Sequence, residues 1–322
     1  MQAIVVNQPG GPDALQITEL PDPVPAAGEV LIRVKAFGLN HADTYMRSGR
    51  WPLDVPVLGI ECAGVVEADP SGTLAPGTTV VALVGGMARS RNGSYAELVT
   101  VPATNVVPVR TSLSWPELAA LPELYATAWI ALNGNLRLAP GETVLVRGAT
   151  SALGQAAVNI AVDLGATVIA TTRSEARAGL LRALGASDVL IDDGVLAERV
   201  QVDCVLDLVG NAVLRDSLRA VRPKGRVVQI GFLGGLDPVA DFNPLADLPS
   251  GVELSTFASA FVLGSDAFPL SAVPLQELVE KAERGRFQAK PTRVFAFEEI
   301  AEAHRIMEAN EAGGKLVVAL AA

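Results

Sequence analysis

The chain has 322 residues, half of them hydrophobic, and a formal net charge of −10. This length exceeds what one hydrophobic core usually sustains, so we expect two domains. The acidic balance disfavours nucleic acid as a partner. No apolar stretch approaches about 20 residues, and no basic segment precedes an apolar one at the start, so we expect a cytoplasmic protein with no membrane partner.

Residues 1–118 contain short apolar or alternating runs separated by proline and glycine. The runs are MQAIVV, EVLIRVKAFGL, AGVVEAD, TTVVALV and AELVTV. Such spacing predicts a mostly antiparallel, barrel-like domain with few helices. Cys62 here and Cys204 further on lie inside apolar runs, which favours burial as small hydrophobic side chains over a disulfide.

From about Trp115 the pattern becomes helix and strand in turn. PELAALPELYATAWIALNG reads as one helix, and the strands that follow are TVLV, VIATT, DVLI, VDCVLDLV, GRVVQIG and VELSTFA. Six such strands predict an α/β fold with a doubly wound parallel sheet over residues 119–257. The segment 258–322 adds two helices and a final strand, KLVVAL, which we expect to rejoin the first domain.

Residues 143–172 read as a buried strand, a glycine-bounded turn, a helix and a second buried strand. A turn of this kind presents backbone N–H groups and a helix N-terminus to a pyrophosphate. The alternative is a turn that only packs its helix against the sheet. The cofactor-binding candidates in the turn are Gly148, Ala149, Thr150, Ser151, Ala152, Leu153 and Gly154.

The end of the second strand of this unit bears on the choice of dinucleotide. NAD-binding folds place an acidic residue there, whereas this chain has Thr172, Arg173 and Ser174, with Arg177 one turn on. Guanidinium groups can bind a 2′-phosphate, so NADPH is favoured over NADH. The alternative is that both arginines are solvated charges on a helix face.

Motifs in the same order along nearly the whole chain resemble one family. They are GLNHADTYMRSG, PVLGIECAGVV, NGSYAELV, AALPELYATAW, GATSALG, LDLVG, GRVVQIG and GGKLVV. The chain is similar to the zinc-independent quinone oxidoreductases of the medium-chain dehydrogenase/reductase superfamily. The resemblance implies a GroES-like catalytic domain, 1–118 completed by 258–322, an inserted Rossmann domain, 119–257, and a homodimer formed through the edge of the Rossmann sheet.

The same resemblance bears on metal binding. Zinc-dependent relatives carry cysteine, histidine and cysteine where this chain has Asn40, Ile60 and Glu123. These three side chains cannot provide the donors that Zn²⁺ needs, so we expect no metal. For Glu123 we expect a surface or salt-bridged carboxylate, because buried acids are rare. The alternative is a desolvated carboxyl group in the cleft, whose raised pKa would make it a proton source.

The resemblance also assigns residues to the site. It places Asn40 and Tyr45 in the substrate site, Thr127 near the nicotinamide, and Lys315 near the cofactor. It adds Val209, Gly231 and Phe232 to the cofactor site, at the carboxyl ends of parallel strands. The alternatives are a turn cap for Asn40, packing for Tyr45 and Thr127, and a strand-edge charge for Lys315. Asp192 stands where NADPH-using relatives often carry tyrosine, and His304 reads as structural.

These expectations favour an NADPH-dependent reductase that needs no metal and transfers a hydride to quinones or other conjugated carbonyl compounds. Within enzymes, the alternatives are an enoyl-thioester reductase and a zinc-type alcohol dehydrogenase. A non-catalytic NADPH-binding sensor or structural protein is the alternative of another class, since fold does not fix function. The expected partner is a small-molecule substrate.

Overall fold

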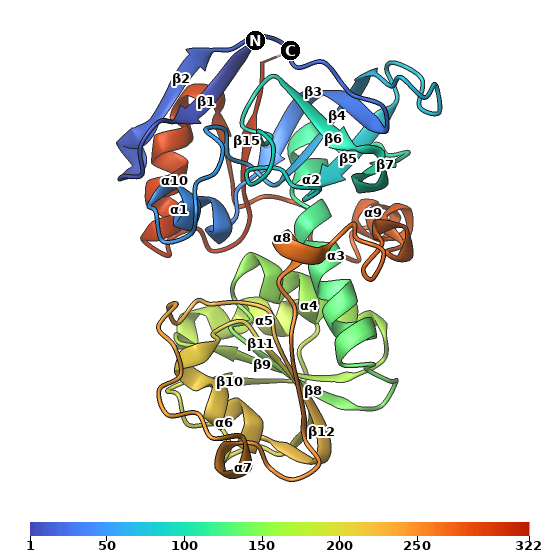
Figure 1. Ribbon diagram of the computed structural model, residues 1–322. Helices are drawn as coiled ribbons and strands as arrows, with labels where there is room; N and C mark the ends of the chain where they lie inside the picture. The colour runs from blue at the N-terminus through green and yellow to red at the C-terminus, as the bar shows by residue number, and fades with distance from the viewer. Residues whose placement is uncertain (322) are drawn as a thin grey trace. The chain divides into compact units, whose positions relative to one another are not determined.

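The computed structural model describes residues 1–321. The chain forms two compact units. The first combines Met1–Glu123 with Ser259–Ala322, and the second is the continuous segment Leu124–Ala258, drawn from green to orange in Figure 1. The chain therefore leaves the first unit, completes the second, and returns.

The first unit contains a seven-stranded sheet of order β14-β15-β3-β4-β5-β7, with β6 pairing β3 outside this path. Its neighbouring strands are antiparallel except for the pair β14 and β15. β3 pairs with three strands, which fits its nearly continuous apolar sequence. β1 and β2 form a separate antiparallel pair. The strands are β1 (Gln2–Val6), β2 (Leu15–Glu19), β3 (Glu29–Gly38), β4 (Glu61–Ala68), β5 (Thr79–Leu83), β6 (Leu98–Pro102), β7 (Val106–Pro108), β14 (Arg293–Ala296) and β15 (Leu316–Ala319).

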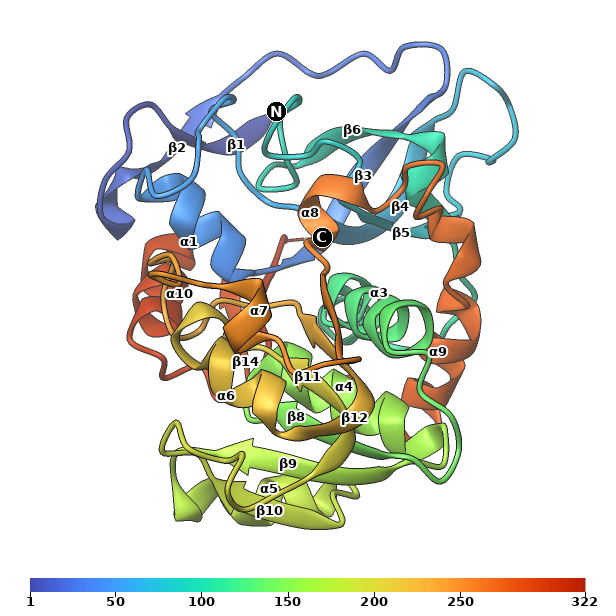
Figure 2. The same cartoon turned by 60° about the horizontal axis from the view of Figure 1, so that its bottom comes forward.

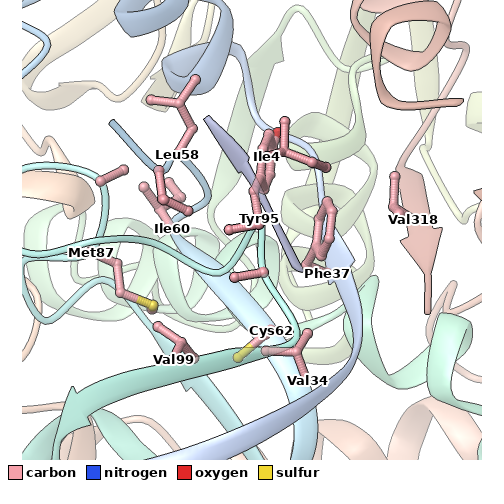
Figure 3. Close-up of a cluster of buried hydrophobic side chains, with 14 of the residues drawn as sticks. Ile4, Val34, Phe37, Leu58, Ile60, Cys62, Met87, Tyr95, Val99 and Val318 are labelled. Carbon is pink, nitrogen blue, oxygen red and sulfur yellow. The ribbon is translucent and has the colours of Figure 1, made fainter. Parts of the chain in front are cut away.

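Aromatic and aliphatic side chains from distant segments fill the core of this unit (Figure 3). Phe37 stacks on Tyr95 with ring centroids 4.5 Å apart. Cys62 is buried in the same cluster, and both cysteines are free, as the sequence predicts. The core therefore joins β3, β4 and the segment before β6.

Residues from 259 onwards complete the first unit. β15 pairs antiparallel with β3, and Val318 lies opposite Phe37. α10 buries Ile300, Ala303 and Met307, which recur at helical spacing. The helices of this unit are α1 (His41–Arg47), α2 (Trp115–Ala119), α8 (Ser259–Val262), α9 (Leu275–Glu283) and α10 (Ile300–Glu308).

The second unit contains a six-stranded parallel sheet of order β10-β9-β8-β11-β12-β13. Figure 2 shows β8, β9 and β10 side by side. The strand order reverses between β8 and β11, so the predicted doubly wound fold is confirmed. The strands are β8 (Thr143–Arg147), β9 (Thr167–Thr172), β10 (Asp188–Ile191), β11 (Val202–Asp207), β12 (Val221–Gln229) and β13 (Glu253–Thr256); the helices that lie wholly within the unit are α4 (Ala152–Asp163), α5 (Ala178–Ala183), α6 (Leu214–Arg219) and α7 (Pro244–Asp247).

The single helix predicted before β8 is wrong. The segment divides into α2, then α3 (Pro122–Trp129), then a π-helical turn, Ile130–Asn135. Pro122 lacks an N–H group and disfavours helical geometry in the residue before it, so the first helix ends and a second begins at the proline. Among residues 1–321, no helix has both the length and the apolar character needed to cross a bilayer.

Candidate active site

The turn between β8 and α4 requires glycine at both of its ends. Gly148 has a φ of 80°, which favours glycine. A Cβ atom at Gly154 would lie 2.6 Å from the Cα of Ala149 and from the carbonyl oxygen of Gly148. Only glycine allows this approach between the turn and the first helical residues, so the glycine-bounded turn read from the sequence is present.

Ser151 caps α4. Its Oγ accepts a hydrogen bond from the N–H of Gly154 at 3.1 Å and donates to the carbonyl oxygen of Gly148 at 2.9 Å. Other N–H groups of the first helical turn have no partner within the helix, and the helix dipole adds positive potential there. Residues 148–154 are therefore suited to hold a pyrophosphate.

The carboxyl ends of neighbouring strands meet beside this turn. A Cβ at Gly148 would lie 3.2 Å from the Cβ of Leu208, and one at Gly231 would lie 2.6 Å from the Leu208 carbonyl oxygen. Val209 donates its N–H to Asp207 Oδ1 at 2.8 Å, and Phe232 follows Gly231. The structure thus brings together the turn and the candidates that follow β11 and β12. They lie at the edge of the sheet where the strand order reverses, and doubly wound sheets bind their ligands at this edge.

The end of β9 presents two exposed cations. Thr172 is buried, and its Oγ accepts the N–H of Ser174 at 3.1 Å, which fixes the backbone as it leaves the strand. Arg173 and Arg177 are exposed, as is Ser174. Two guanidinium groups at this edge suit a phosphate monoester.

In the first unit, Lys315, Asn40 and Glu61 form a hydrogen-bonded cluster. Lys315 Nζ donates to Asn40 Oδ1 at 2.7 Å and to Glu61 Oε1 at 2.5 Å. Asn40 Nδ2 donates to the same Glu61 oxygen at 2.9 Å. Lys315 is 6% exposed and Glu61 is fully buried, so the ion pair is shielded from water.

Three elements position this cluster. Asn40 is the N-cap residue of α1, Glu61 is the first residue of β4, and Lys315 immediately precedes β15. A Cβ at Gly38, the last residue of β3, would lie 2.5 Å from Glu61 Oε1 and from Lys315 Cε. Glycine at this point makes room for the ion pair.

Glu123 lies next to the cluster and is not on the surface. Its N–H donates to Glu61 Oε2 at 2.9 Å, and its Oε1 accepts the hydroxyl of Ser259 at 2.8 Å. The side chain is buried, so the expectation of a surface carboxylate is wrong. The reason is the start of α3, which turns the Glu123 backbone towards the Glu61 carboxylate.

Asp43 holds the loop that carries Asn40. Its Oδ2 accepts the N–H of Asn40 at 2.9 Å, and its Oδ1 accepts the N–H of Gly59 at 3.3 Å. Burial raises the pKa of Asp43 to about 7. This carboxyl group therefore changes charge near neutral pH while it supports the site.

His304 has no solvent contact and bonds to Tyr95, with 3.1 Å between Nε2 and the tyrosine oxygen. Burial lowers the pKa of His304 to about 3, so the ring is neutral at physiological pH. These contacts support the structural role expected for His304.

Tyr45 belongs to a group of aromatic side chains in the first unit. Its ring lies 5.3 Å from Trp51, and Trp51 lies 5.8 Å from Phe261, whose face contacts the guanidinium of Arg89 at 4.0 Å. Burial raises the pKa of Tyr45, so its phenol is protonated at neutral pH and can donate a proton or a hydrogen bond. Thr127, the third catalytic candidate, is buried on α3 in the second unit.

Sequence reasoning missed Glu61, Ser259 and Arg147. Glu61 interrupts an apolar run at the start of a buried strand, and Arg147 ends the apolar run TVLV. A charge at such a position signals a buried partner. The partners themselves are remote in sequence, so the pairings needed the fold.

The chain matches two family descriptions: "Alcohol dehydrogenase GroES-like domain" over residues 26–111 and "Zinc-binding dehydrogenase" over residues 184–318. It is similar to a phenolphthiocerol/phthiocerol polyketide synthase of Mycobacterium tuberculosis, with 30% identity over 98% of this chain and 14% of that protein. It is 31% identical to lovastatin diketide synthase of Aspergillus terreus over 98% of this chain and 13% of that protein. The chain thus spans a small part of these curated relatives.

Solved structures match the chain over its whole length. An NAD-dependent alcohol dehydrogenase is 30% identical, with a TM-score of 0.84 and 100% of both chains covered. The CurK enoyl reductase is 27% identical, with a TM-score of 0.83 and 99% of both chains covered. The Escherichia coli quinone oxidoreductase complexed with NADPH is 25% identical, with a TM-score of 0.87, covering 99% of this chain and 100% of that one.

One family description names zinc, but the donor set here does not fit that ion. By the resemblance, Asn40, Ile60 and Glu123 stand where zinc-dependent relatives carry their ligands, and the structure shows the ammonium of Lys315 bonded to Asn40 and Glu61. Within the described residues, no three His, Cys, Asp or Glu side chains gather to hold a metal. On its fold, its matched domains and its full-length relatives, the chain belongs to the medium-chain dehydrogenase/reductase superfamily of oxidoreductases.

Proposed function

We propose that the protein reduces quinones and other conjugated carbonyl compounds with NADPH and without a metal. The observation that carries this proposal is the Lys315–Asn40–Glu61 cluster, in which an ammonium orients the amide of Asn40, the residue that by resemblance replaces a zinc ligand. A lysine ammonium only donates hydrogen bonds, so Lys315 fixes Oδ1 of Asn40 as the acceptor and Nδ2 as the donor.

The second unit supplies the residues for NADPH. The turn 148–154 would hold the pyrophosphate, and Arg173 and Arg177 would bind the 2′-phosphate. Val209, Gly231 and Phe232 would line the same edge. The Escherichia coli relative solved with NADPH supports this choice of cofactor. Bound NADPH would supply the hydride.

The first unit supplies polar groups for the substrate. Tyr45 carries a protonated phenol as the candidate proton donor, and Asn40 offers an amide N–H. In the second unit, the resemblance places Thr127 near the nicotinamide. Conjugated acceptors suit such groups, because their developing charge is delocalised and hydrogen bonds suffice to stabilise it. An alkoxide from a simple ketone would lack Lewis-acid stabilisation.

An enoyl-thioester reductase is the second candidate. Polyketide synthases match this chain over nearly its full length, and an enoyl reductase shares its fold. In that reaction a hydride adds to the β-carbon, the C=C bond is reduced, and a proton adds to the α-carbon. The same phenol and amide would serve it.

Oxidation of NADPH by a substrate panel tests the proposal. The panel contains 1,4-benzoquinone, 2-cyclohexenone, crotonyl-coenzyme A and, as a saturated control, cyclohexanone, each with and without a chelator. We expect turnover of the quinone and enone, none of cyclohexanone, and no effect of chelation. Activity confined to crotonyl-coenzyme A selects the second candidate. Chelator-sensitive turnover selects a zinc enzyme, and NADPH binding with no turnover selects a sensor.

We also propose a homodimer formed through an outer strand of the six-stranded sheet, and a cytoplasmic location. β10 and β13 are the edges of that sheet, and an unpaired strand edge can accept a second copy. Sedimentation velocity tests the first proposal and cell fractionation the second. A monomer at micromolar concentration would contradict the dimer.

A further inference from the structure

Arg147, the last residue of β8, is a fully buried cation directly before the glycine turn. Its Nε and Nη2 donate to Oδ2 and Oδ1 of Asp192 at 2.8 and 2.9 Å, a bidentate pair. Its Nη1 donates to Asp216 Oδ2 at 2.7 Å and to Ser217 Oγ at 3.0 Å. All three guanidinium nitrogens are therefore engaged with groups beneath the carboxyl edge of the sheet.

Asp192 stands beside the place where doubly wound folds recognise the cofactor ribose. It follows β10, and its N–H donates to the carbonyl oxygen of Thr172, at the end of β9, at 2.9 Å. A carboxylate at the end of β9 selects against a 2′-phosphate. Asp192 is one strand away from that position and carries the same charge.

Both oxygens of the Asp192 carboxylate are occupied from inside the protein. Besides Arg147, Oδ1 accepts the N–H of Gly194 at 3.0 Å and Oδ2 accepts the hydroxyl of Thr171 at 3.4 Å. The side chain is 8% exposed. Burial raises the pKa of Asp192 and the Arg147 hydrogen bonds lower it, with a net decrease, so the group is a charged carboxylate paired with a guanidinium that it shares with Asp216.

The same network reaches the turn that would hold the pyrophosphate. Thr171 Oγ accepts the N–H of Gly148 at 3.0 Å while it donates to Asp192. The position of Asp192 is thus tied to the first residue of the turn. Arg147 therefore acts on two parts of one cofactor site, the ribose end and the pyrophosphate turn.

We propose that Arg147 is a specificity-determining positioning residue that selects a 2′-phosphorylated dinucleotide by holding the Asp192 carboxylate inward and neutralising it. Because the charge of Asp192 is paired with Arg147, the exposed Arg173 and Arg177 determine the sign of the electrostatic potential at the ribose. This inference rests on the proposed NADPH-dependent function. Arg147 touches no cofactor atom and acts through Asp192.

Calorimetric titration of the full chain with adenosine 2′,5′-bisphosphate and with 5′-ADP tests this role. The measured quantity is the ratio of the two dissociation constants. General loosening of the fold weakens both probes alike and leaves the ratio unchanged, whereas an uncompensated carboxylate beside the ribose repels the 2′-phosphate more strongly than the 5′-phosphates and lowers the ratio. We expect the wild type to prefer the bisphosphate by at least about tenfold.

Substitution of Arg147 and Asp192 separates charge from structure. R147Q is expected to lower the preference about tenfold, because it leaves Asp192 unpaired. The double variant R147Q/D192N is expected to restore the preference for the bisphosphate to within about threefold of the wild type. D192N alone is expected to keep this preference or raise it. R147K keeps the charge but cannot bind both carboxylate oxygens, so its preference should fall about threefold.

A parallel loss of both probes in R147Q, or a double variant that stays as low as R147Q, would overturn the inference. If R147Q does not fold, R147K takes its place in the test. An unchanged ratio of the two dissociation constants in R147K would then overturn the inference. A wild type that binds neither probe, or prefers 5′-ADP, contradicts the proposed cofactor itself. This failure of the proposed cofactor is distinguishable from a failure of the Arg147 inference, because it appears in the wild type before any substitution is made.

Discussion

Lys315 Nζ donates to Glu61 Oε1 at 2.5 Å, and both side chains are buried in the first unit. The Glu61 carboxylate also accepts hydrogen bonds from the side chain of Asn40 and from the backbone of Glu123. A buried carboxylate that receives this many donors is stabilised as an ion only while its countercharge is present. The cluster therefore links the stability of the unit to the orientation of the Asn40 amide.

Replacement of Lys315 by methionine is expected to lower the free energy of unfolding by about 3 kcal/mol, because Glu61 is left as an unpaired buried charge. The double variant K315M/E61Q removes both charges and should recover at least half of the loss. Urea unfolding at neutral pH measures both values. An equal loss in the two variants would show that packing, and not ion pairing, is responsible.

Gly154→Ala is expected to weaken NADPH binding at least about tenfold, because its Cβ would lie 2.6 Å from backbone atoms of the turn. Gly179→Ala is the matched control. Gly179 lies on α5, and a Cβ atom added there would meet no other heavy atom within 4 Å, so that variant should bind NADPH as the wild type does and be slightly more stable. Fluorescence titration with NADPH compares them. Wild-type affinity in G154A would remove the turn from the cofactor site.

Asp43 predicts a pH dependence of stability. Burial raises its pKa from 3.8 to about 7, so the folded protein holds this proton more tightly than the unfolded chain. The stabilisation is full below pH 3.8 and is lost as the pH rises through about 7. The advantage of the wild type over D43N, in free energy of unfolding, should fall by up to about 4 kcal/mol over this interval.

Urea unfolding of both proteins at several pH values between these limits measures that advantage. D43N is a control of the same shape with no titrating group, although its single amide oxygen can accept only one of the N–H groups of Asn40 and Gly59, which bond to separate oxygens of Asp43. A difference that does not change with pH would mean that Asp43 is not protonated in the folded protein near neutrality.

Tyr45→Phe is expected to lower kcat for a quinone by about 100- to 10,000-fold, the usual contribution of a general acid. The phenylalanine ring keeps the packing against Trp51, 5.3 Å away in the wild type. Stopped-flow measurement of NADPH oxidation gives kcat. Full activity in Y45F would assign proton transfer to another group or to solvent.

The sequence predicts the second unit well because its signals are local. The glycines at 148 and 154, the apolar strands and the helix between them all lie within 30 residues, and the alternation of strands and helices predicts a doubly wound parallel sheet. The break at Pro122 was also readable, since proline rarely continues a helix.

The candidate site is less predictable because its contacts join remote positions. Asn40, Glu61 and Lys315 are separated by up to 275 residues, and no local pattern pairs them. Arg147 ends β8 and Asp192 follows β10, 45 residues later, and they meet only because both strands pair with β9. The motif comparison placed Asn40 and Lys315 in one protein family's site, but it did not indicate that Glu61 connects them.

The pairing of β15 with β3 has a consequence for the order of folding during synthesis. Residues 124–258 are continuous, so this unit can fold as soon as it leaves the ribosome. The sheet of the other unit cannot be completed until β15 is made, some 280 residues after its partner strand β3. Until then, the flank of β3 that β15 covers is an open edge flanked by apolar side chains. A nascent chain halted before residue 316 should therefore carry one protease-resistant unit and recruit chaperones to the other.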